Sequence, residues 1–439
     1  MGVRSKHAAV GAAVHGGTDA ALQCKQGHVL AFAAPVREIP MPQLAQRMRR
    51  AKPSAIMLIA EKAKALQAAG RDIISFSIGV PNFLPGPHVY EAAARALQHD
   101  SGQYGSNRGS NVLLDAFLAH LAQAGLPGYT RENLSTGVGA KHILYNLAEA
   151  LLEEGDEIAF PTPYWTSYLD IAEIVGAKVK LLPCPPAQGY KLTPRQLDAA
   201  LTPATRVFLF NNPSNPTGMV YTRAEIAALA EVLARKPDTW IITDDIYHRM
   251  VFDGLGYHNF VQFQPQLRER LVFVDSLSKT YGMPGWRVGF MAGPKAVASA
   301  VTTLNSNHIT NIPEITTAAA IAALSGPQDV TMRQVEDFAR RRDRVHAALV
   351  AIPGISCPRP QGAFYAFPDV SAFFGKRCGD TVIGDDVAFC AALLDSKGVA
   401  CVPGSAFGEP RALRISYTCP AAQLEPGLER IAAFCAELR

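Results

Sequence analysis

A lysine that directly follows an apolar segment is the first residue whose position suggests chemistry. Residues 271–275 read LVFVD, which is typical of a buried strand, and residues 276–279 read SLSK. Ligands of α/β proteins bind just beyond the carboxyl ends of such strands. Transfer of a lysine out of water lowers its pKa and favours the neutral amine that attacks carbonyl carbons. Lys279 is therefore a candidate for Schiff-base chemistry.

An arginine lies eight residues further along the chain. Residues 285–290 read GWRVGF, so Arg287 is flanked by glycines and apolar residues, and we expect it to be shielded from bulk solvent. Such an arginine needs an anionic partner, and its planar set of donors matches a phosphate. Arg287 is thus a candidate phosphate ligand, and a structural ion pair with a carboxylate is the alternative.

A carboxylate and a phenol follow another predicted strand. Residues 239–243 read TWIIT and continue as DDIY, so Asp244 and Tyr247 are three residues apart. Near one pocket, such a carboxylate would keep a pyridine nitrogen protonated, and the phenol would bind a ring oxygen. The alternative is that Asp244 or Asp245 caps the helix that follows.

Two loops add candidates for ligand binding. Residues 212–218 read NPSNPTG, a rigid turn sequence that contains Asn215 and follows a strand ending at Phe210. Residues 137–141 read GVGAK and open a predicted helix. Glycines before a helix allow backbone N–H groups to approach a phosphate, which the helix dipole also attracts. Gly139 and Ala140 are therefore candidates for a phosphate site.

An aromatic residue and a second arginine complete the set. Residues 161–165 read PTPYW after a predicted strand, and Trp165 could stack on a flat ring. Residues 413–417 read LRISY, so Arg414 lies in an apolar strand. From there its guanidinium could hold a substrate carboxylate through two hydrogen bonds. A core tryptophan and a solvent-facing arginine are the alternatives.

Alternating strands and helices must position these residues. Apolar segments predict strands at 73–78, 156–160, 178–182, 205–210, 239–243, 271–275 and 287–291. Periodic segments predict helices at 89–99, 110–123, 140–152, 165–175, 222–235 and 294–306. This order favours an α/β fold whose mostly parallel sheet is covered by helices on both faces. After residue 326, helices at 331–351, 384–397 and 421–437 and a strand at 412–417 favour a smaller α+β domain, which the helix at 54–69 joins.

The composition limits the kind of protein. The chain has 439 residues, of which 48% are hydrophobic and 18% charged, as expected for a folded globular protein. Its net charge of +4 gives no electrostatic reason to expect nucleic-acid or membrane binding. No apolar run reaches the roughly 18 residues of a membrane-spanning helix. The eight cysteines form no C-x-x-C pair, so we expect no structural metal and a reducing, cytoplasmic location.

Taken together, these motifs resemble the pyridoxal-phosphate-dependent aminotransferases of classes I and II, and within them the aspartate aminotransferases. The resemblance runs from about residue 54 to the C-terminus, with the matching loops in order. It implies fold type I, with a seven-stranded, mostly parallel sheet in a large cofactor-binding domain at 81–330. Residues 41–80 together with 331–439 would form the small α+β domain, and we expect residues 1–40 to be a disordered arm.

The resemblance also implies roles for the candidate residues. Lys279 would be the Schiff-base lysine of pyridoxal 5′-phosphate and the proton shuttle at the substrate Cα. Asp244 would pair with the pyridine nitrogen, and Tyr247 and Asn215 would bind the ring hydroxyl. The other implied cofactor contacts are Gly139, Ala140, Lys141, Trp165, Ser276, Arg287 and Tyr104. Tyr104 would be lent to the neighbouring subunit, which implies a homodimer with shared active sites.

Substrate contacts follow from the same resemblance. Gly79, Asn215 and Arg414 would hold the substrate carboxylate, while Lys141 and Trp165 would face a second, side-chain carboxylate. The implied reaction moves an amino group between an L-amino acid, with aspartate or another dicarboxylate favoured, and a 2-keto acid such as 2-oxoglutarate.

Two alternatives stay open for the reaction. Phe364 and Tyr365 could line a pocket for an aromatic amino acid. A lyase or synthase on the same scaffold would use Lys279 and Asp244 equally well, because both reactions need the same electron sink.

Overall fold

The computed structural model describes residues 43–99 and 102–439. Within this part, Ala45–Arg439 form one compact unit. The predicted arm at 1–40 lies outside the described residues, and the division of the remaining chain into a large and a small domain stays a prediction. None of the helices in the described part is long and apolar enough to cross a membrane.

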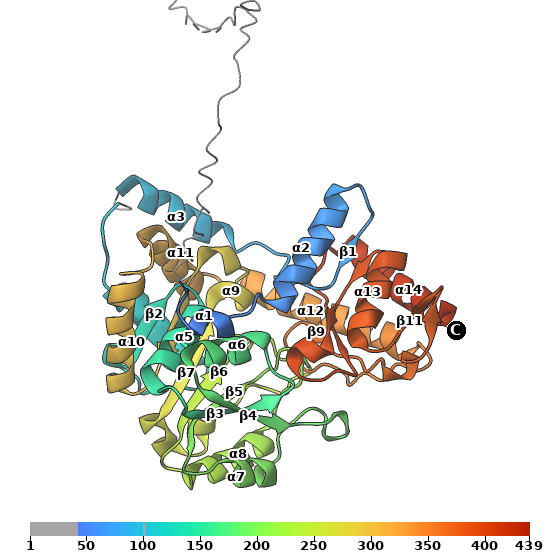
Figure 1. The fold of residues 1–439 in the computed structure, drawn as a ribbon. Coiled ribbons are helices and arrows are strands. Elements are labelled where there is room, and N and C mark those ends of the chain that lie inside the picture. Colours follow the sequence, from blue (N-terminus) through green and yellow to red (C-terminus); the bar gives the residue numbers. More distant parts are fainter. Residues whose placement is uncertain (1–42, 100–101) are drawn as a thin grey trace, which may run out of the picture. The chain divides into compact units, whose positions relative to one another are not determined.

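A seven-stranded sheet forms the centre of the α/β part (Figure 1). Its strand order is β2-β8-β7-β6-β5-β3-β4, and β8 is the strand that runs antiparallel to its neighbours. The strands are β2 Leu134–Gly137, β3 Glu157–Thr162, β4 Lys178–Pro183, β5 Thr205–Asn211, β6 Trp240–Asp244, β7 Leu271–Ser276 and β8 Gly289–Ala292. The prediction of a mostly parallel α/β sheet is therefore confirmed.

One predicted strand belongs elsewhere. The segment 73–78 contributes only β1 (Ile74–Ser75), which pairs with β12 (Val399–Ala400) outside the central sheet. The seventh strand of the central sheet is instead β2, which was not predicted. Its sequence, LSTG, has no apolar run that would predict a strand. Its polar side chains can be buried because other parts of the chain hydrogen-bond to them: Ser135 Oγ lies 3.0 Å from Thr302 Oγ1.

Helices cover both faces of this sheet, as the apolar strands predicted. Val207 and Leu209 of β5 pack in one apolar core with α5 and α6, whereas Phe208 and Phe210 pack in a second core with α4 and α8. The helices of this part are α1 Arg47–Arg50, α2 Ala55–Ala68, α3 Pro87–His99, α4 Asn111–Gln123, α5 Ala140–Leu151, α6 Thr166–Val175, α7 Pro194–Ala200, α8 Arg223–Ala234, α9 Leu277–Thr280, α10 Lys295–His308 and α11 Glu314–Ser325. Alternate residues of one strand thus support opposite layers.

Four of these helices were not predicted: the four-residue helices α1 and α9, and also α7 and α11. The α11 segment reads EITTAAAIAALS, and it packs against α3 and α4 with apolar residues around most of its circumference, so it lacks a helical period. The α7 helix has only seven residues and starts at a capping box in which Thr193 and Gln196 satisfy each other's backbone N–H groups.

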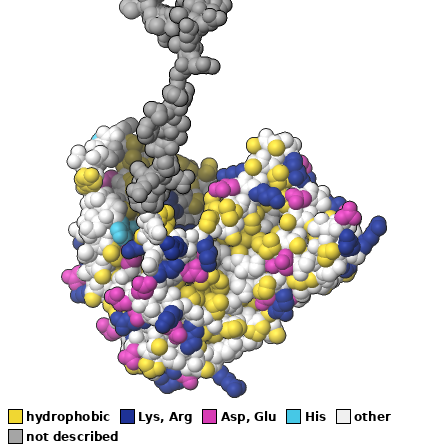
Figure 2. All heavy atoms as spheres, viewed as in Figure 1, with side chains coloured by type: hydrophobic (Ala, Val, Ile, Leu, Met, Phe, Trp, Pro, Cys, Tyr) yellow, Lys and Arg dark blue, Asp and Glu magenta, His cyan; other side chains and the backbone are white. Residues whose placement is uncertain are grey.

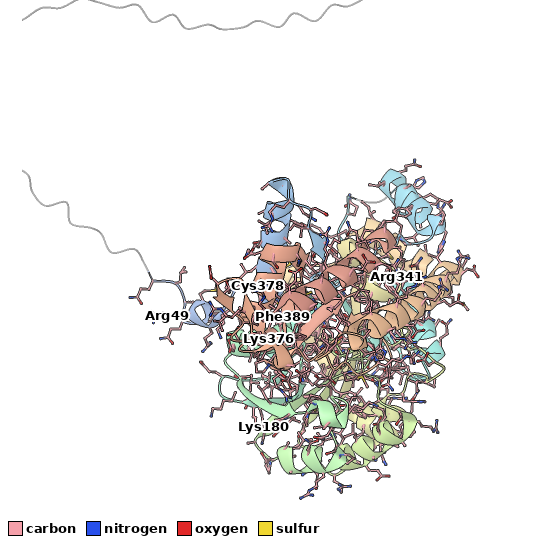
Figure 3. All side chains as sticks on the ribbon, turned by 90° about the vertical axis from the view of Figure 1, so that its right-hand side faces the viewer. Arg49, Lys180, Arg341, Lys376, Cys378 and Phe389 are labelled. Atoms are coloured by element: carbon pink, nitrogen blue, oxygen red, sulfur yellow. The ribbon has the colours of Figure 1, made fainter. Side chains whose placement is uncertain are left out.

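The C-terminal part combines helices with short strands. Its helices are α12 Asp329–Val350, α13 Asp386–Lys397 and α14 Ala421–Glu437, and its strands are β9 Tyr365–Ala366, β10 Arg377–Cys378, β11 Thr381–Val382, β12 Val399–Ala400, β13 Val402–Pro403 and β14 Leu413–Ser416. The antiparallel sheet β13-β14-β9 carries Arg414. Phe389, labelled in Figure 3, packs edge-to-face on Phe434 at 5.1 Å and joins α13 to α14.

Candidate active site

A cavity of about 400 Å³ opens at the carboxyl ends of the parallel strands. Strands β5, β6 and β7 end at this edge, the start of α2 contributes Ser54, Ile56 and Met57, and β14 contributes Arg414. Eleven of the predicted site residues line the cavity: Gly79, Ala140, Lys141, Trp165, Asn215, Asp244, Tyr247, Ser276, Lys279, Arg287 and Arg414. The chain thus brings together residues that are up to 335 positions apart (414 − 79).

Lys279 lies in α9, one short turn beyond β7. Its Nζ donates a hydrogen bond to the Gly79 carbonyl oxygen at 2.7 Å. Burial lowers the pKa of Lys279 to about 8, and the nearby Arg414 adds to this effect while Asp244 opposes it. With this pKa about a tenth of the amine is neutral at pH 7, far more than for an ordinary lysine, and the neutral amine is the form that nucleophilic and proton-transfer chemistry requires.

Asp244 is the last residue of β6 and is fully buried. Tyr168 Oη donates a hydrogen bond to Oδ2 at 2.6 Å, whereas Oδ1 has no hydrogen-bond partner among the described residues. Burial raises the pKa of Asp244 to about 6, although the Tyr168 hydrogen bond lowers it. A buried carboxylate oxygen without a donor is costly, so Asp244 is poised to accept a hydrogen bond from a ligand.

Tyr168 was not among the predicted site residues. It lies three residues after Trp165, so both face the cavity from the first turn of α6. An aromatic residue at that spacing from Trp165 was the available signal.

The two tyrosines Tyr247 and Tyr365 share a hydrogen bond of 2.8 Å between their hydroxyl groups. Tyr365 also passes so close to Gly79 that a Cβ at position 79 would clash with its hydroxyl oxygen. Position 79 therefore requires glycine for a steric reason. Phe364 does not line the cavity; its ring is buried with Lys279 Nζ 5.8 Å from the ring centre.

Arg414 reaches the cavity from the opposite side. It is fully buried, and it donates hydrogen bonds to Asn215 Oδ1 at 3.1 Å and to the Ser77 carbonyl oxygen at 2.5 Å. The rings of Tyr365 and Phe407 flank its guanidinium at 4.7 and 4.9 Å. No carboxylate pairs with Arg414 in the described part of the chain. A buried, oriented guanidinium of this kind suits an anionic ligand.

The N-terminus of α5 meets Arg287 at another wall. Gly139 has φ +92°, and a Cβ there would lie 2.5 Å from Arg287 Nη2. Arg287 donates hydrogen bonds to the Val138 and Pro284 carbonyl oxygens at 2.6 and 2.9 Å. The expectation that Arg287 is shielded from solvent is wrong: its side chain is exposed, because it projects into the open cavity.

Lys141 lies in the first turn of α5, with its Nζ 5.0 Å from the centre of the Trp165 ring. Burial lowers the pKa of Lys141, while Asp170 opposes the shift. Trp165 is half-buried and is the residue immediately before α6. A cation over an aromatic face in a ligand cavity is available to a second anionic group.

Two predicted residues are not in the cavity lining. Gly139 lies against the Arg287 guanidinium, which does line the cavity. Tyr104 is 88% exposed and does not line the cavity of its own chain.

Comparison with known proteins agrees with this geometry. A family model described as aminotransferase class I and II matches residues 71–431. The chain belongs to this family. It is a pyridoxal-phosphate-dependent aminotransferase, a transferase of the EC 2.6.1 type, as the resemblance predicted.

Curated relatives and solved structures cover most of this aminotransferase. An aspartate/prephenate aminotransferase of Cereibacter sphaeroides is 42% identical over 91% of this chain and 100% of its own. The crystal structure of the aspartate aminotransferase from Rhizobium meliloti superposes with a TM-score of 0.87 at 40% identity, covering 90% of this chain and 100% of that one. The Thermus thermophilus aspartate aminotransferase with maleate has a TM-score of 0.83 at 32% identity, with 90% and 100% coverage.

The cavity of this aminotransferase fits its cofactor in two independent places. Asp244 Oδ1 lacks a donor, and a protonated pyridine nitrogen is one. At the other end, the first N–H groups of α5 have no intrahelical acceptors and lie beside Arg287, as a phosphate requires.

Proposed function

We propose that this aminotransferase transfers the amino group of aspartate, or of another dicarboxylic amino acid, to a 2-keto acid such as 2-oxoglutarate. The observation that carries the proposal is the charge of the cavity. Its lining includes four basic side chains, Lys141, Lys279, Arg287 and Arg414, and one carboxylate, Asp244. One basic group serves as the reactive amine, so three remain for three anions: a phosphate and two carboxylates.

We assign the cofactor contacts by the same chemistry. When bound, pyridoxal phosphate supplies an aldehyde carbon that links to amines and a ring that withdraws electrons. Asp244 accepts the pyridinium N–H, and Tyr247 and Asn215 bind the ring hydroxyl. Trp165 stacks on the ring, while the Gly139–Ala140 backbone holds the phosphate, together with Ser276 and Arg287.

Lys279 carries the proton transfer. Its lowered pKa leaves the Nζ amine able to accept a proton from the substrate Cα and to give it back later in the cycle. The Gly79 carbonyl oxygen, 2.7 Å from Nζ, orients the amine towards the cavity.

Two positions hold the substrate's ends. Arg414, with Asn215 and the Gly79 backbone, binds the α-carboxylate, and Lys141 at the Trp165 face binds the side-chain carboxylate. Relatives named for aspartate support this, as does the Thermus enzyme crystallised with maleate, which is itself a dicarboxylate. Prephenate, in the name of the Cereibacter relative, is a keto acid with two carboxylates, so it belongs to the same substrate class.

A panel of amino donors against 2-oxoglutarate and prephenate tests the substrate. We expect kcat/KM to be highest for aspartate or glutamate, and Lys141→Met to lower it about tenfold or more, since a hydrogen bond to a charged group contributes about 1.5–3 kcal/mol. Alanine, which has no second carboxylate, should be used equally well by both proteins. Preference for phenylalanine in the unmodified enzyme would contradict the proposal, and turnover without any keto acid would favour a lyase.

We also propose a homodimer in which Tyr104 completes the partner's phosphate site. Large exposed apolar side chains concentrate between Met48 and Val112, and hydrophobic side chains are visible over α2 and the surface beside it (Figure 2). Exposed apolar side chains in this number support an association site. Light scattering should give twice the chain mass, and Val112→Glu should shift it towards monomer. Val387→Glu, at a comparably exposed valine on α13, is the matched control.

A further inference from the structure

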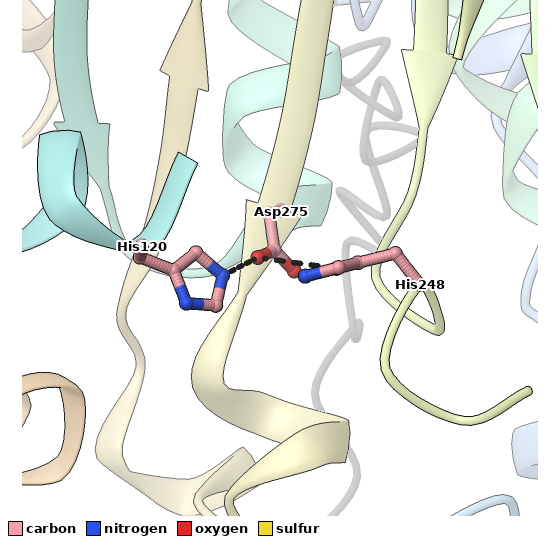
Figure 4. A group of neighbouring side chains, drawn as sticks. All are labelled: His120, His248 and Asp275. Carbon is pink, nitrogen blue, oxygen red and sulfur yellow. Dashed lines mark hydrogen bonds and ion pairs between the residues drawn. The ribbon is translucent and has the colours of Figure 1, made fainter. Parts of the chain in front are cut away.

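Three buried side chains meet near the carboxyl end of β7 (Figure 4). Asp275 lies near the end of β7, His120 comes from α4, and His248 comes from the turn after β6. His120 Nε2 lies 2.9 Å from Asp275 Oδ2, and His248 Nδ1 lies 3.6 Å from the same oxygen. All three side chains are at least 95% buried.

The proton positions follow from the partners. His248 Nδ1 also lies 3.0 Å from the Asp245 carbonyl oxygen, which can only accept, so Nδ1 carries the proton. Burial lowers the pKa of His248 to about 4, so the ring is neutral. Asp275 has a pKa below its usual value, because His248, His120 and the Ser276 N–H together outweigh its burial. The cluster is therefore a carboxylate held by donors.

A metal ion is the obvious alternative occupant. The candidate ligand atoms of the three residues lie within 4.8 Å of one another. A metal needs a lone pair on each nitrogen, however, and the proton on His248 Nδ1 occupies the position that would face the ion. The arrangement fits hydrogen bonding better than metal ligation.

The cluster joins the two turns that carry the reactive groups. The second carboxylate oxygen, Asp275 Oδ1, accepts the Ser276 N–H at 2.7 Å, and Ser276 Oγ accepts the Ser278 N–H at 3.4 Å, which begins the α9 turn before Lys279. On the other side, His248 directly follows Tyr247 in the turn after Asp244. One carboxylate thus contacts both turns through different oxygen atoms.

We propose that Asp275, held between His120 and His248, is a positioning residue that orients Ser276 for the cofactor phosphate and fixes the α9 turn against the turn after β6. This rests on the proposed role of Ser276 as a phosphate ligand. Asp275 does not line the cavity, so it acts only through its neighbours.

The test compares the binding of pyridoxal 5′-phosphate with that of pyridoxal, which lacks the phosphate. Dissociation constants for both are measured on the apoenzyme by visible absorbance. We expect Asp275→Ala to weaken pyridoxal 5′-phosphate binding about tenfold more than pyridoxal binding, because an unoriented hydroxyl loses a charge-assisted hydrogen bond. Asp275→Asn keeps an acceptor for the Ser276 N–H and should restore most of the ratio, even if the alanine variant does not fold.

A matched control separates orientation from general destabilisation. Asp386 is an equally buried carboxylate that accepts the Ser405 N–H at 2.6 Å, and it does not line the cavity. Asp386→Ala should lower stability without changing the ratio of the two dissociation constants.

The outcomes distinguish this proposal from the proposed phosphate site. If Ser276→Ala changes the ratio but neither Asp275 variant does, the positioning role is wrong. If Ser276→Ala leaves the ratio of the two dissociation constants unchanged, the assignment of Ser276 as a phosphate ligand is wrong. A stoichiometric metal ion in the purified enzyme that Asp275→Ala removes would also overturn the proposal in favour of a metal site.

Discussion

Asp244 and Asp275 lie at the carboxyl ends of adjacent strands and are both 1% exposed, yet their pKa values shift in opposite directions. Burial raises the pKa of Asp244 to about 6. Asp275 is equally buried, but its surrounding donors hold its pKa below the usual value. The difference lies in the donors: Asp275 has protein partners on both oxygens, whereas Asp244 has Tyr168 on one oxygen and none on the other in the described chain.

The contrast separates a carboxylate that serves a ligand from one that serves the fold. A carboxylate with all its hydrogen bonds made within the protein is stabilised in its charged form. A buried carboxylate oxygen without a hydrogen-bond donor destabilises the protein. A ligand that donates a hydrogen bond to this oxygen removes the destabilisation and therefore binds more tightly. Asp244 therefore favours a protonated ring nitrogen, and Asp275 keeps the neighbouring turn in place.

The largest expected effect is on kcat, which should fall much more when Asp244 is replaced than when Asp275 is replaced. Asp244→Asn should lower kcat by about 10²–10³-fold at saturating cofactor, since breaking a buried charge pair costs about 3–5 kcal/mol. Asp275→Asn should lower kcat less than about tenfold under the same conditions, because it touches neither cofactor nor substrate. Steady-state kinetics with a fixed amino donor measure both. Similar losses in the two variants would remove the distinction.

The next effect concerns the free energy of unfolding of the apoprotein, which Asp244→Asn should raise and Asp275→Asn should lower. The pKa of Asp244 is raised, so the stability that its bound proton contributes is lost as pH rises through about 6. Asp244→Asn should then stabilise the apoprotein at about pH 7 by up to about 3 kcal/mol. The pKa of Asp275 is lowered, so its contribution is present above its unfolded value and is lost as pH falls. Asp275→Asn should cost about 2 kcal/mol at about pH 7.

Urea unfolding of the apoproteins at about pH 7 and about pH 4 measures this comparison. The Asp244→Asn difference should shrink at about pH 4, where Asp244 is protonated in the folded protein. The Asp275→Asn difference should largely persist there, because the pKa of Asp275 lies below its usual value. A loss of stability in Asp244→Asn at about pH 7 would show that hydrogen bonds within the protein already outweigh the cost of burying the carboxylate, contrary to its raised pKa.

Local sequence explains why one carboxylate was predicted and the other was not. Asp244 follows an apolar strand and precedes Tyr247, so its place at the sheet edge is encoded within a few residues. Asp275 also follows an apolar run, but its role depends on His120, which is 155 residues away in sequence. A local sequence pattern cannot predict a contact between residues so far apart in the chain.

The predicted strands show the same dependence on contacts that are distant in sequence. Strands with continuous apolar runs, such as β5 and β7, were predicted nearly to their ends, because burial on both faces is encoded in composition. Strand β2 was missed because its buried serine and threonine depend on Thr302 and Asn305 of α10. Arg287 was predicted as a site residue but expected to be shielded, since its chain neighbours do not reveal an open cavity.

The smallest effect tests the hydrogen bond that the Asp244 carboxylate receives from the Tyr168 hydroxyl. The Tyr168 hydroxyl, 2.6 Å from Oδ2, lowers the pKa of Asp244. Tyr168→Phe removes this donor, so the pKa of Asp244 should rise above its value of about 6. Cofactor binding should weaken by less than about tenfold, since one hydrogen bond to a charged group contributes about 1.5–3 kcal/mol and the ligand restores part of it. The acidic limb of the cofactor-binding profile should move to higher pH, because more base is then needed to ionise Asp244.

Tyr164→Phe is the matched control, because Tyr164 is buried on the same segment but does not contact Asp244 or line the cavity. Its binding profile should superpose on that of the unmodified protein. An unchanged profile in Tyr168→Phe would mean that Asp244 is ionised by its ligand alone. The contrast with Asp275 would then rest on the donors around Asp275, since the Tyr168 hydroxyl would contribute nothing to the ionisation of Asp244.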